Sequence, residues 1–136
     1  AFGCIWASLA IYTSEALLKS NPDLVKRFVR ATMKSLMWTA ANKEAAMAEV
    51  VKVSPDRDLK LETRKLEIIY GLYNTPDYAQ RFGLMTDAKW QSSIDILAES
   101  GDLTKKPTAK EMYTNAIVES LDEAKALAEV VKKATH

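Results

Sequence analysis

Apolar side chains recur every third or fourth residue along most of this chain, which is the spacing of an amphipathic helix. The clearest start is Asn21-Pro22-Asp23, because it combines an N-cap residue, proline in the first helical position and an acid in the first turn. This signal predicts a helix that runs to a break near Asn42-Lys43. Similar patterns predict helices over 14–18, 44–53 and 58–73, from Thr86 or Asp87 to Gly101, and over 119–135, with one turn of helix within 104–114. The last helix is predicted to open with a capping box, Ser120-Leu121-Asp122-Glu123.

The beginning of the chain has a different pattern. Residues 5–12 form a compact apolar run with β-branched and aromatic members, which predicts a buried strand. No second segment of comparable quality follows it. A lone buried strand cannot pair its own backbone groups, so it must pair with another copy of the chain or with a sheet in sequence outside these residues.

These elements define a mainly α single domain over residues 1–136, with one orphan strand and five or six helices. The chain opens with Ala1-Phe2-Gly3 and without an initiator methionine, so we expect the interior of a longer reading frame. A cleaved mature terminus is the alternative. The apolar start lacks a basic leader and is too short to span a bilayer, so no direct membrane insertion is expected.

Several aromatic and basic residues invite a functional interpretation, but packing is the simpler one. Trp38 and Trp90 lie on apolar helical stripes and are predicted to be core residues. The tyrosines near Asn74, at positions 70, 73 and 78, could form the rim of a site, but we predict that their rings anchor a loop and that their hydroxyls are hydrated. The basic positions 26, 27, 30 and 34 could contact a partner protein or a phosphate, and a solvated helix face is the interpretation we adopt.

Composition limits the chemistry further. With 19 Lys and Arg against 18 Asp and Glu, the net charge of +1 gives no electrostatic case for nucleic acid. One cysteine, Cys4, cannot form an internal disulfide or a cysteine-based zinc site, and one histidine, His136, cannot build a histidine metal site or triad. We therefore expect no catalytic residue, no metal and no cofactor in this chain.

Five segments, in order, resemble the C-terminal half of one family, the ABC-transporter solute-binding proteins of the thiamine-pyrimidine-precursor and nitrate/sulfonate/taurine type. The resemblance covers roughly residues 6–116. The segments are Trp6-Ala7-Ser8-Leu9-Ala10-Ile11-Tyr12-Thr13-Ser14, Asn21-Pro22-Asp23-Leu24-Val25-Lys26-Arg27-Phe28-Val29-Arg30-Ala31-Thr32, Gly83-Leu84-Met85-Thr86-Asp87-Ala88-Lys89-Trp90-Gln91, Ile96-Leu97-Ala98-Glu99-Ser100-Gly101-Asp102-Leu103 and Met112-Tyr113-Thr114-Asn115.

The resemblance implies that the parent has an α/β two-lobed fold, the type II periplasmic binding protein fold. In that fold residues 5–12 are the hinge crossover strand, residues 14–115 are the helical C-terminal portion of lobe 1, and 119–135 is a terminal helix beyond the matched region. The orphan strand is then explained, because its sheet partners come from the N-terminal half.

The same resemblance places Trp6 and Ser8 at the hinge end of the crossover strand, where ligand-lining groups are expected. Trp6 would stack on a planar heterocycle. The alternative is that both residues belong to the core of the sheet. The family's usual Tyr-Gly-Asn is Trp6-Ala7-Ser8 here, so the ligand-facing end of the strand is expected to differ.

The resemblance implies an extracytoplasmic protein, not an enzyme, that captures a small solute by hinge closure and delivers it to an ABC permease. One alternative is a fragment of the pyrimidine-synthesising thiamine-biosynthesis enzyme of the same fold, whose active-site His and pyridoxal-phosphate Lys would lie in the missing half. Another is a free-standing helical module that forms a homodimer. A fragment of the binder would expose a large apolar surface on its strand and first two helices and is expected to dimerise.

Overall fold

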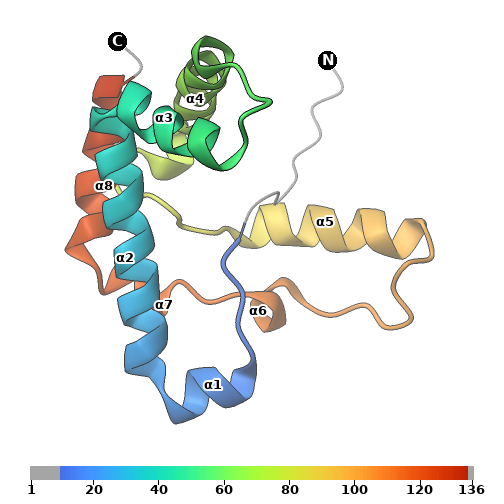
Figure 1. The fold of residues 1–136 in the computed structure, drawn as a ribbon. Coiled ribbons are helices and arrows are strands. Elements are labelled where there is room, and N and C mark those ends of the chain that lie inside the picture. The colour runs from blue at the N-terminus through green and yellow to red at the C-terminus, as the bar shows by residue number, and fades with distance from the viewer. Residues whose placement is uncertain (1–9, 135–136) are drawn as a thin grey trace.

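The computed structural model describes residues 10–134, which are helical apart from their connections (Figure 1). The elements are α1 (Glu15–Ser20), α2 (Pro22–Ala41), α3 (Lys43–Val53), α4 (Leu59–Tyr73), the 3-10 helix η1 (Pro76–Tyr78), α5 (Asp87–Glu99), α6 (Ala109–Met112), α7 (Ala116–Glu119) and α8 (Asp122–Ala134). The mainly helical prediction is confirmed for this part of the chain. The helices beyond the expected five or six are short, because α6 and α7 have only four residues each.

The predicted strand over 5–12 falls mostly outside the described part of the chain. Of its residues, only 10–12 are described, and they form no strand. Between residues 10 and 134 no segment is a β-strand. The two-lobed parent fold therefore stays a prediction.

Polar N-cap side chains explain why the helices begin where the sequence predicts. The side chain of Asn21 accepts a hydrogen bond from the backbone N–H of Leu24 at 3.1 Å, with Pro22 in the first turn. The carboxylate of Asp58 accepts in the same way from Leu61 at 2.7 Å. Ser14 and Thr86 cap α1 and α5 by the same contact. At the other end of α5, Gly101 follows with a φ of 82°, the left-handed conformation expected of a glycine stop.

The predicted capping box at Ser120 is wrong. Ser120 has φ −81° and ψ −3°, a helical conformation, whereas an N-cap residue is extended. It ends α7, its hydroxyl donates to the carbonyl of Ile117 at 2.8 Å, and α8 begins at Asp122. The reciprocal Thr-to-Glu contact occurs instead at α6, where the carboxylate of Glu111 accepts from the backbone N–H of Thr108 at 2.7 Å.

The core lies where α2, α4 and α8 meet. One face of α8 is almost completely buried, with Leu127 and Ala124 at 0% exposure. It packs on α2 through Val29 and Met33 and on α4 through Tyr70. The remaining members of this cluster are Val118, Leu121 and Val131.

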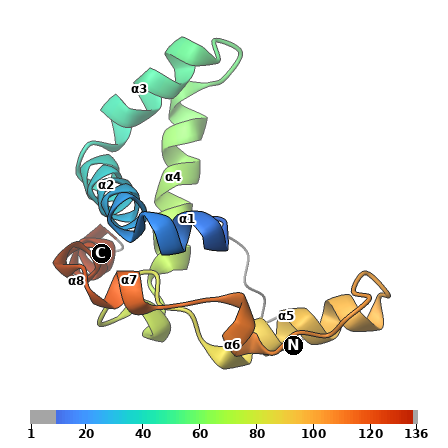
Figure 2. The ribbon, with the colours of Figure 1, turned by 90° about the horizontal axis from the view of Figure 1, so that it is seen from below.

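A second part of the molecule projects from this core. Residues 86–112, here called the arm, contain α5 and α6, which pack chiefly on each other (Figure 2). Inside the arm, Ile94 and Ala109 are buried. Trp90 is half-buried and stacks on Tyr113 with ring centroids 6.0 Å apart, so its predicted packing role is confirmed in part.

Two predictions about the inward faces of the helices are wrong. Trp38 is 53% exposed, although its stripe on α2 is apolar. On the helix over 58–73 the spacing predicts an inward stripe of Leu59, Leu66, Ile69 and Tyr73. Leu66 and Tyr73 do pack against the core, beside Tyr70, whereas Leu59 and Ile69 are exposed. The reason in both cases is that these helices carry apolar residues on more than one side, so that spacing alone does not identify the side that packs.

Candidate functional site: an exposed apolar face of α2

The two predicted ligand residues, Trp6 and Ser8, lie outside the described residues 10–134. Their role in ligand binding therefore stays a prediction. Candidate sites in the described part are a hollow beside α3, an aromatic cluster, the basic positions of α2 and an apolar face of the same helix. Each would bind a ligand of a different chemical kind.

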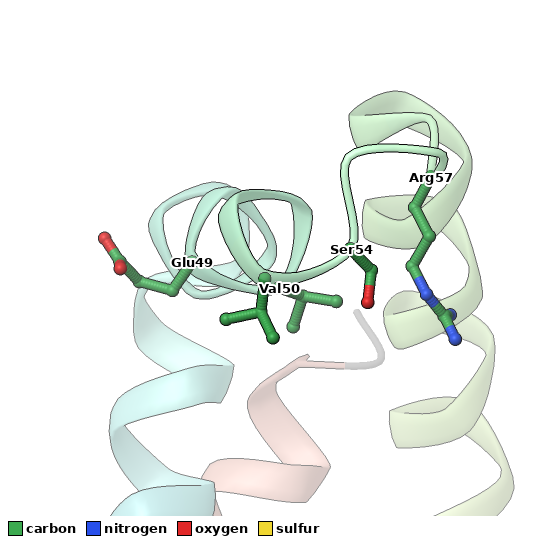
Figure 3. A pocket seen from close by; sticks show the side chains of 5 residues that line it. Glu49, Val50, Ser54 and Arg57 are labelled. Atoms are coloured by element: carbon green, nitrogen blue, oxygen red, sulfur yellow. The ribbon is translucent and has the colours of Figure 1, made fainter.

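The hollow lies between the end of α3 and the turn into α4, and Figure 3 shows the side chains around it. It is open and shallow, and Val50 and Val53 supply most of its apolar lining. Its one cation, Arg57, lies 3.4 Å from the carboxylate of Glu62. Because this charge already has a partner and no other polar groups converge, the hollow is poorly suited to hold a small solute. The remaining lining residues are Glu49 and Ser54.

Glu62 is itself a buried acid with two basic neighbours. The ammonium of Lys65 donates to its carboxylate at 2.7 Å, and Arg57 lies on its other oxygen. The hydrogen bond from Lys65 lowers the pKa of Glu62 below its ordinary value, against the opposing effect of burial. This acid is therefore charged at neutral pH and joins the turn before α4 to the helix.

The aromatic cluster anchors the loop after α4, as the sequence predicts. Tyr73 makes edge-to-face contacts with Tyr70 at 6.0 Å and with Phe82 at 5.2 Å, and Tyr78 lies 5.0 Å from Phe82. The expectation that these hydroxyls are hydrated is wrong for Tyr70, which is 1% exposed and donates to the carbonyl of Leu36 at 2.5 Å. Burial raises the pKa of Tyr70 to about 12. The cluster is filled by its own rings and offers no cavity for a ligand ring.

Three of the four basic positions of α2 lie beside acids of the same chain. Arg30 and Lys34 both approach the carboxylate of Glu123 on α8, at 3.3 and 3.8 Å, and Arg27 lies 3.9 Å from Asp23. These contacts support the interpretation of a solvated face whose charges help to hold α2 against α8. They leave no concentrated positive patch for a phosphate.

The most distinctive surface is the side of α2 that faces away from α8. Leu24, Phe28, Ala31, Ser35 and Trp38 follow one another at helical spacing, and all five are exposed. We call this set the outer stripe of α2. Leu24 is 42% exposed, Phe28 60% and Trp38 53%. No charged residue interrupts the stripe, which is unusual for a helix face in contact with water.

Within residues 10–134 no group of His, Cys, Asp and Glu side chains is placed to hold a metal ion. None of the described helices combines the length and the apolar character needed to cross a bilayer.

Comparisons with known proteins agree with the resemblance of the sequence segments. The sequence model of the NMT1/THI5-like family matches residues 2–46. A riboflavin-binding protein, RibY of Chloroflexus aurantiacus, is 31% identical over 117 residues, which cover 82% of this chain and 33% of that protein. The chain thus spans about a third of the length of this curated relative. No solved structure matches the chain.

These matches confirm that the chain is similar to solute-binding proteins of the NMT1/THI5-like type. RibY is named for the binding of riboflavin.

Proposed function

We propose that this chain is the C-terminal portion of an extracytoplasmic solute-binding protein. The complete protein captures a small solute by hinge closure between two lobes and delivers it to an ABC permease. The observation that carries the proposal is the 31% identity to a riboflavin-binding protein across most of the chain. In this proposal residues 5–12 cross the hinge, residues 14–115 complete lobe 1 and residues 119–135 form its terminal helix.

For the solute we propose a planar heterocycle. Riboflavin is the first candidate because the relative is named for it, and a thiamine pyrimidine precursor is the second, ahead of nitrate or a sulfonate. Trp6 would stack on the ring system and Ser8 would hydrogen-bond to a polar edge. Most other contacts would come from the part of the parent that this chain does not include.

The test is a titration of the full-length parent with riboflavin, followed by the quenching of flavin fluorescence. We expect saturable binding, and Trp6→Ala should weaken it by about tenfold, equivalent to about 1.4 kcal/mol. Trp6→Phe is the matched control, because it keeps an aromatic face and should retain most of the affinity. If neither riboflavin, nor a pyrimidine precursor, nor nitrate or taurine binds, the proposal is wrong.

Two alternatives make different predictions for the same parent. A pyrimidine-synthesising enzyme would carry its His and pyridoxal-phosphate Lys upstream, and it would bind that cofactor instead of a transported solute. A free-standing homodimer would have a natural mass of 15.2 kDa for each chain. The intact mass of the protein from its own cell, together with fractionation of the cell envelope, separates both alternatives from the extracytoplasmic binder.

A further inference from the structure

We propose that the outer stripe of α2 packs against the part of the parent polypeptide that lies outside residues 1–136. This inference rests on the proposed function, because it requires the chain to be one portion of a longer protein. It assigns an interaction surface to Leu24, Phe28, Ala31, Ser35 and Trp38, and an occupant to that surface.

The opposite side of α2 is already fully used. Val25, Val29 and Met33 are 5–8% exposed and face the α8 side of the helix, where Val29 and Met33 join the core cluster. A helix at the surface of a protein needs only one apolar side, whereas a helix between two packed layers needs two. With one apolar side on α8 and a second one in solvent, α2 has the pattern of an internal helix whose outer layer is missing.

The helix before α2 also has an exposed apolar side chain. The neighbouring α1 packs on α2 and exposes Leu17, which is 39% exposed and precedes Leu24 by seven residues. Monomeric proteins rarely keep a contiguous apolar patch of this length without a function. By contrast, Val53 at the end of α3 is 85% exposed but stands apart from the stripe in sequence and on another helix.

The length of the relative identifies the occupant. The chain spans 33% of RibY, so about two-thirds of a protein of that kind would be available to cover the stripe. Covering it from within the same polypeptide costs no association entropy, because the two parts are joined by the chain. A partner in the parent therefore needs less surface than a separate protein would need.

The charges beside the stripe disfavour a second copy of this chain as the occupant. Arg27 and Lys34 lie seven residues apart and border one flank, and Thr32 and Thr39 border the other. An antiparallel pairing of two α2 helices would bring Arg27 and Lys34 of one copy beside the same two cations of the other. A parallel pairing would place them beside threonine. In neither arrangement does the second copy add an acid to the partners that Arg27 and Lys34 already have within the chain, Asp23 and Glu123.

Side-chain footprinting of the monomeric full-length parent with hydroxyl radicals tests the inference. If the parent covers the stripe, the reactivity of Trp38 should fall about tenfold below the value for its 53% exposure here, as expected of a residue more than 95% buried. Phe28 should be protected in parallel. Met112, which is 44% exposed on α6 of the arm, is the internal control and should stay reactive.

Substitution gives a second measurement. Phe28→Asp should lower the thermal midpoint of the parent strongly, while Val53→Asp should leave it almost unchanged. The inference is overturned if Trp38 in the monomeric parent reacts as a half-exposed residue. It is also overturned if protection appears only at concentrations at which the protein dimerises, because the occupant would then be a second copy. Solute binding is measured on the same samples, so a protected stripe in a protein that binds no solute rejects the proposed function and retains the surface.

Discussion

The side-chain amide of Asn115 pairs with the backbone of Met85 in both directions. The N–H of Met85 donates to Oδ1 of Asn115 at 3.0 Å, and Nδ2 of Asn115 donates to the carbonyl of Met85 at 2.9 Å. One side chain thus satisfies two backbone groups thirty positions away and closes the base of the arm.

We expect Asn115→Ala to lower the free energy of unfolding by about 1–3 kcal/mol, because it leaves a partly buried N–H and carbonyl without these partners. Urea denaturation measures the change. Asn42→Ala is the control: its amide donates one exposed bond to the carbonyl of Trp38 at 2.9 Å, and its removal should cost about 0.5 kcal/mol. Equal losses for the two variants would contradict the special role of Asn115.

The buried hydroxyl of Tyr70 gives a prediction in two parts. Tyr70→Phe removes the bond to the carbonyl of Leu36 and should cost about 1 kcal/mol, while Tyr12→Phe, at a position 94% exposed, should cost nothing measurable. Because the pKa of Tyr70 is raised to about 12, the unfolded chain ionises this tyrosine first as the pH rises above 10.

The stabilisation associated with the raised pKa of Tyr70 is therefore complete below pH 10 and is lost as the pH rises towards 12. Guanidinium unfolding across this range should show a steeper decline for the native sequence than for Tyr70→Phe. Parallel declines for the two proteins would show that another group is responsible.

Two glycines with opposite backbone demands allow a paired test. Gly83 has a φ of 85°, which strains any residue with a Cβ, so Gly83→Ala should destabilise the protein by about 1–2 kcal/mol. Gly71 lies inside α4, and nothing lies within 4 Å of the position that an added Cβ would take. Gly71→Ala should therefore stabilise the protein by about 0.5–1 kcal/mol. Thermal unfolding of both variants measures the difference, and a change of the same sign in both would refute the argument.

The ion pairs of Glu62 should make the stability of the protein fall at acidic pH. Its hydrogen bond with Lys65 lowers the pKa of Glu62 in the folded state, so the unfolded chain takes up this proton first as the pH falls. The contribution is present above the ordinary pKa of about 4.5 and is lost as the pH falls through the lowered value. Glu62→Gln should therefore be less stable than the native sequence at pH 7, and the difference should shrink as the pH falls below the ordinary pKa of a glutamate.

Glu99→Gln, on the exposed end of α5, is the control for general charge effects. It should track the native sequence at each pH. If Glu62→Gln does so too, the ion pairs with Lys65 and Arg57 contribute nothing measurable.

The helix starts could be predicted because their cause is local. Asn21 and Asp58 act on backbone groups three residues ahead, so the sequence contains the whole interaction. The side of a helix that becomes buried depends on the neighbouring helices, which the sequence of one helix does not contain. The apolar spacing therefore predicts Trp38 to be a core residue, although it is exposed. The base of the arm could not be predicted at all, since nothing near Asn115 in sequence points to Met85.

For the candidate site, too, one part could be predicted from the sequence and another could not. The resemblance of the segments to solute-binding proteins could be recognised, because it depends on residue order alone, and the comparisons agree with it. The outer stripe of α2 required the structure, since a stripe of this composition looks like a core face until its exposure is known. The predicted capping box at Ser120 is wrong for a related reason. The spacing of Ser120 and Glu123 fits a capping box, but Ser120 ends α7 in a helical conformation and therefore does not cap α8.

The contact between Met85 and Asn115 has a consequence for how such a chain can change in evolution. The chain leaves the helical core and returns to it at two points that already touch, so a short turn could connect them in place of residues 86–114. The arm can then lengthen, shorten or be exchanged among relatives while α2, α4 and α8 keep their packing. We expect homologous sequences to tolerate insertions and deletions between these two positions far better than anywhere within the core helices.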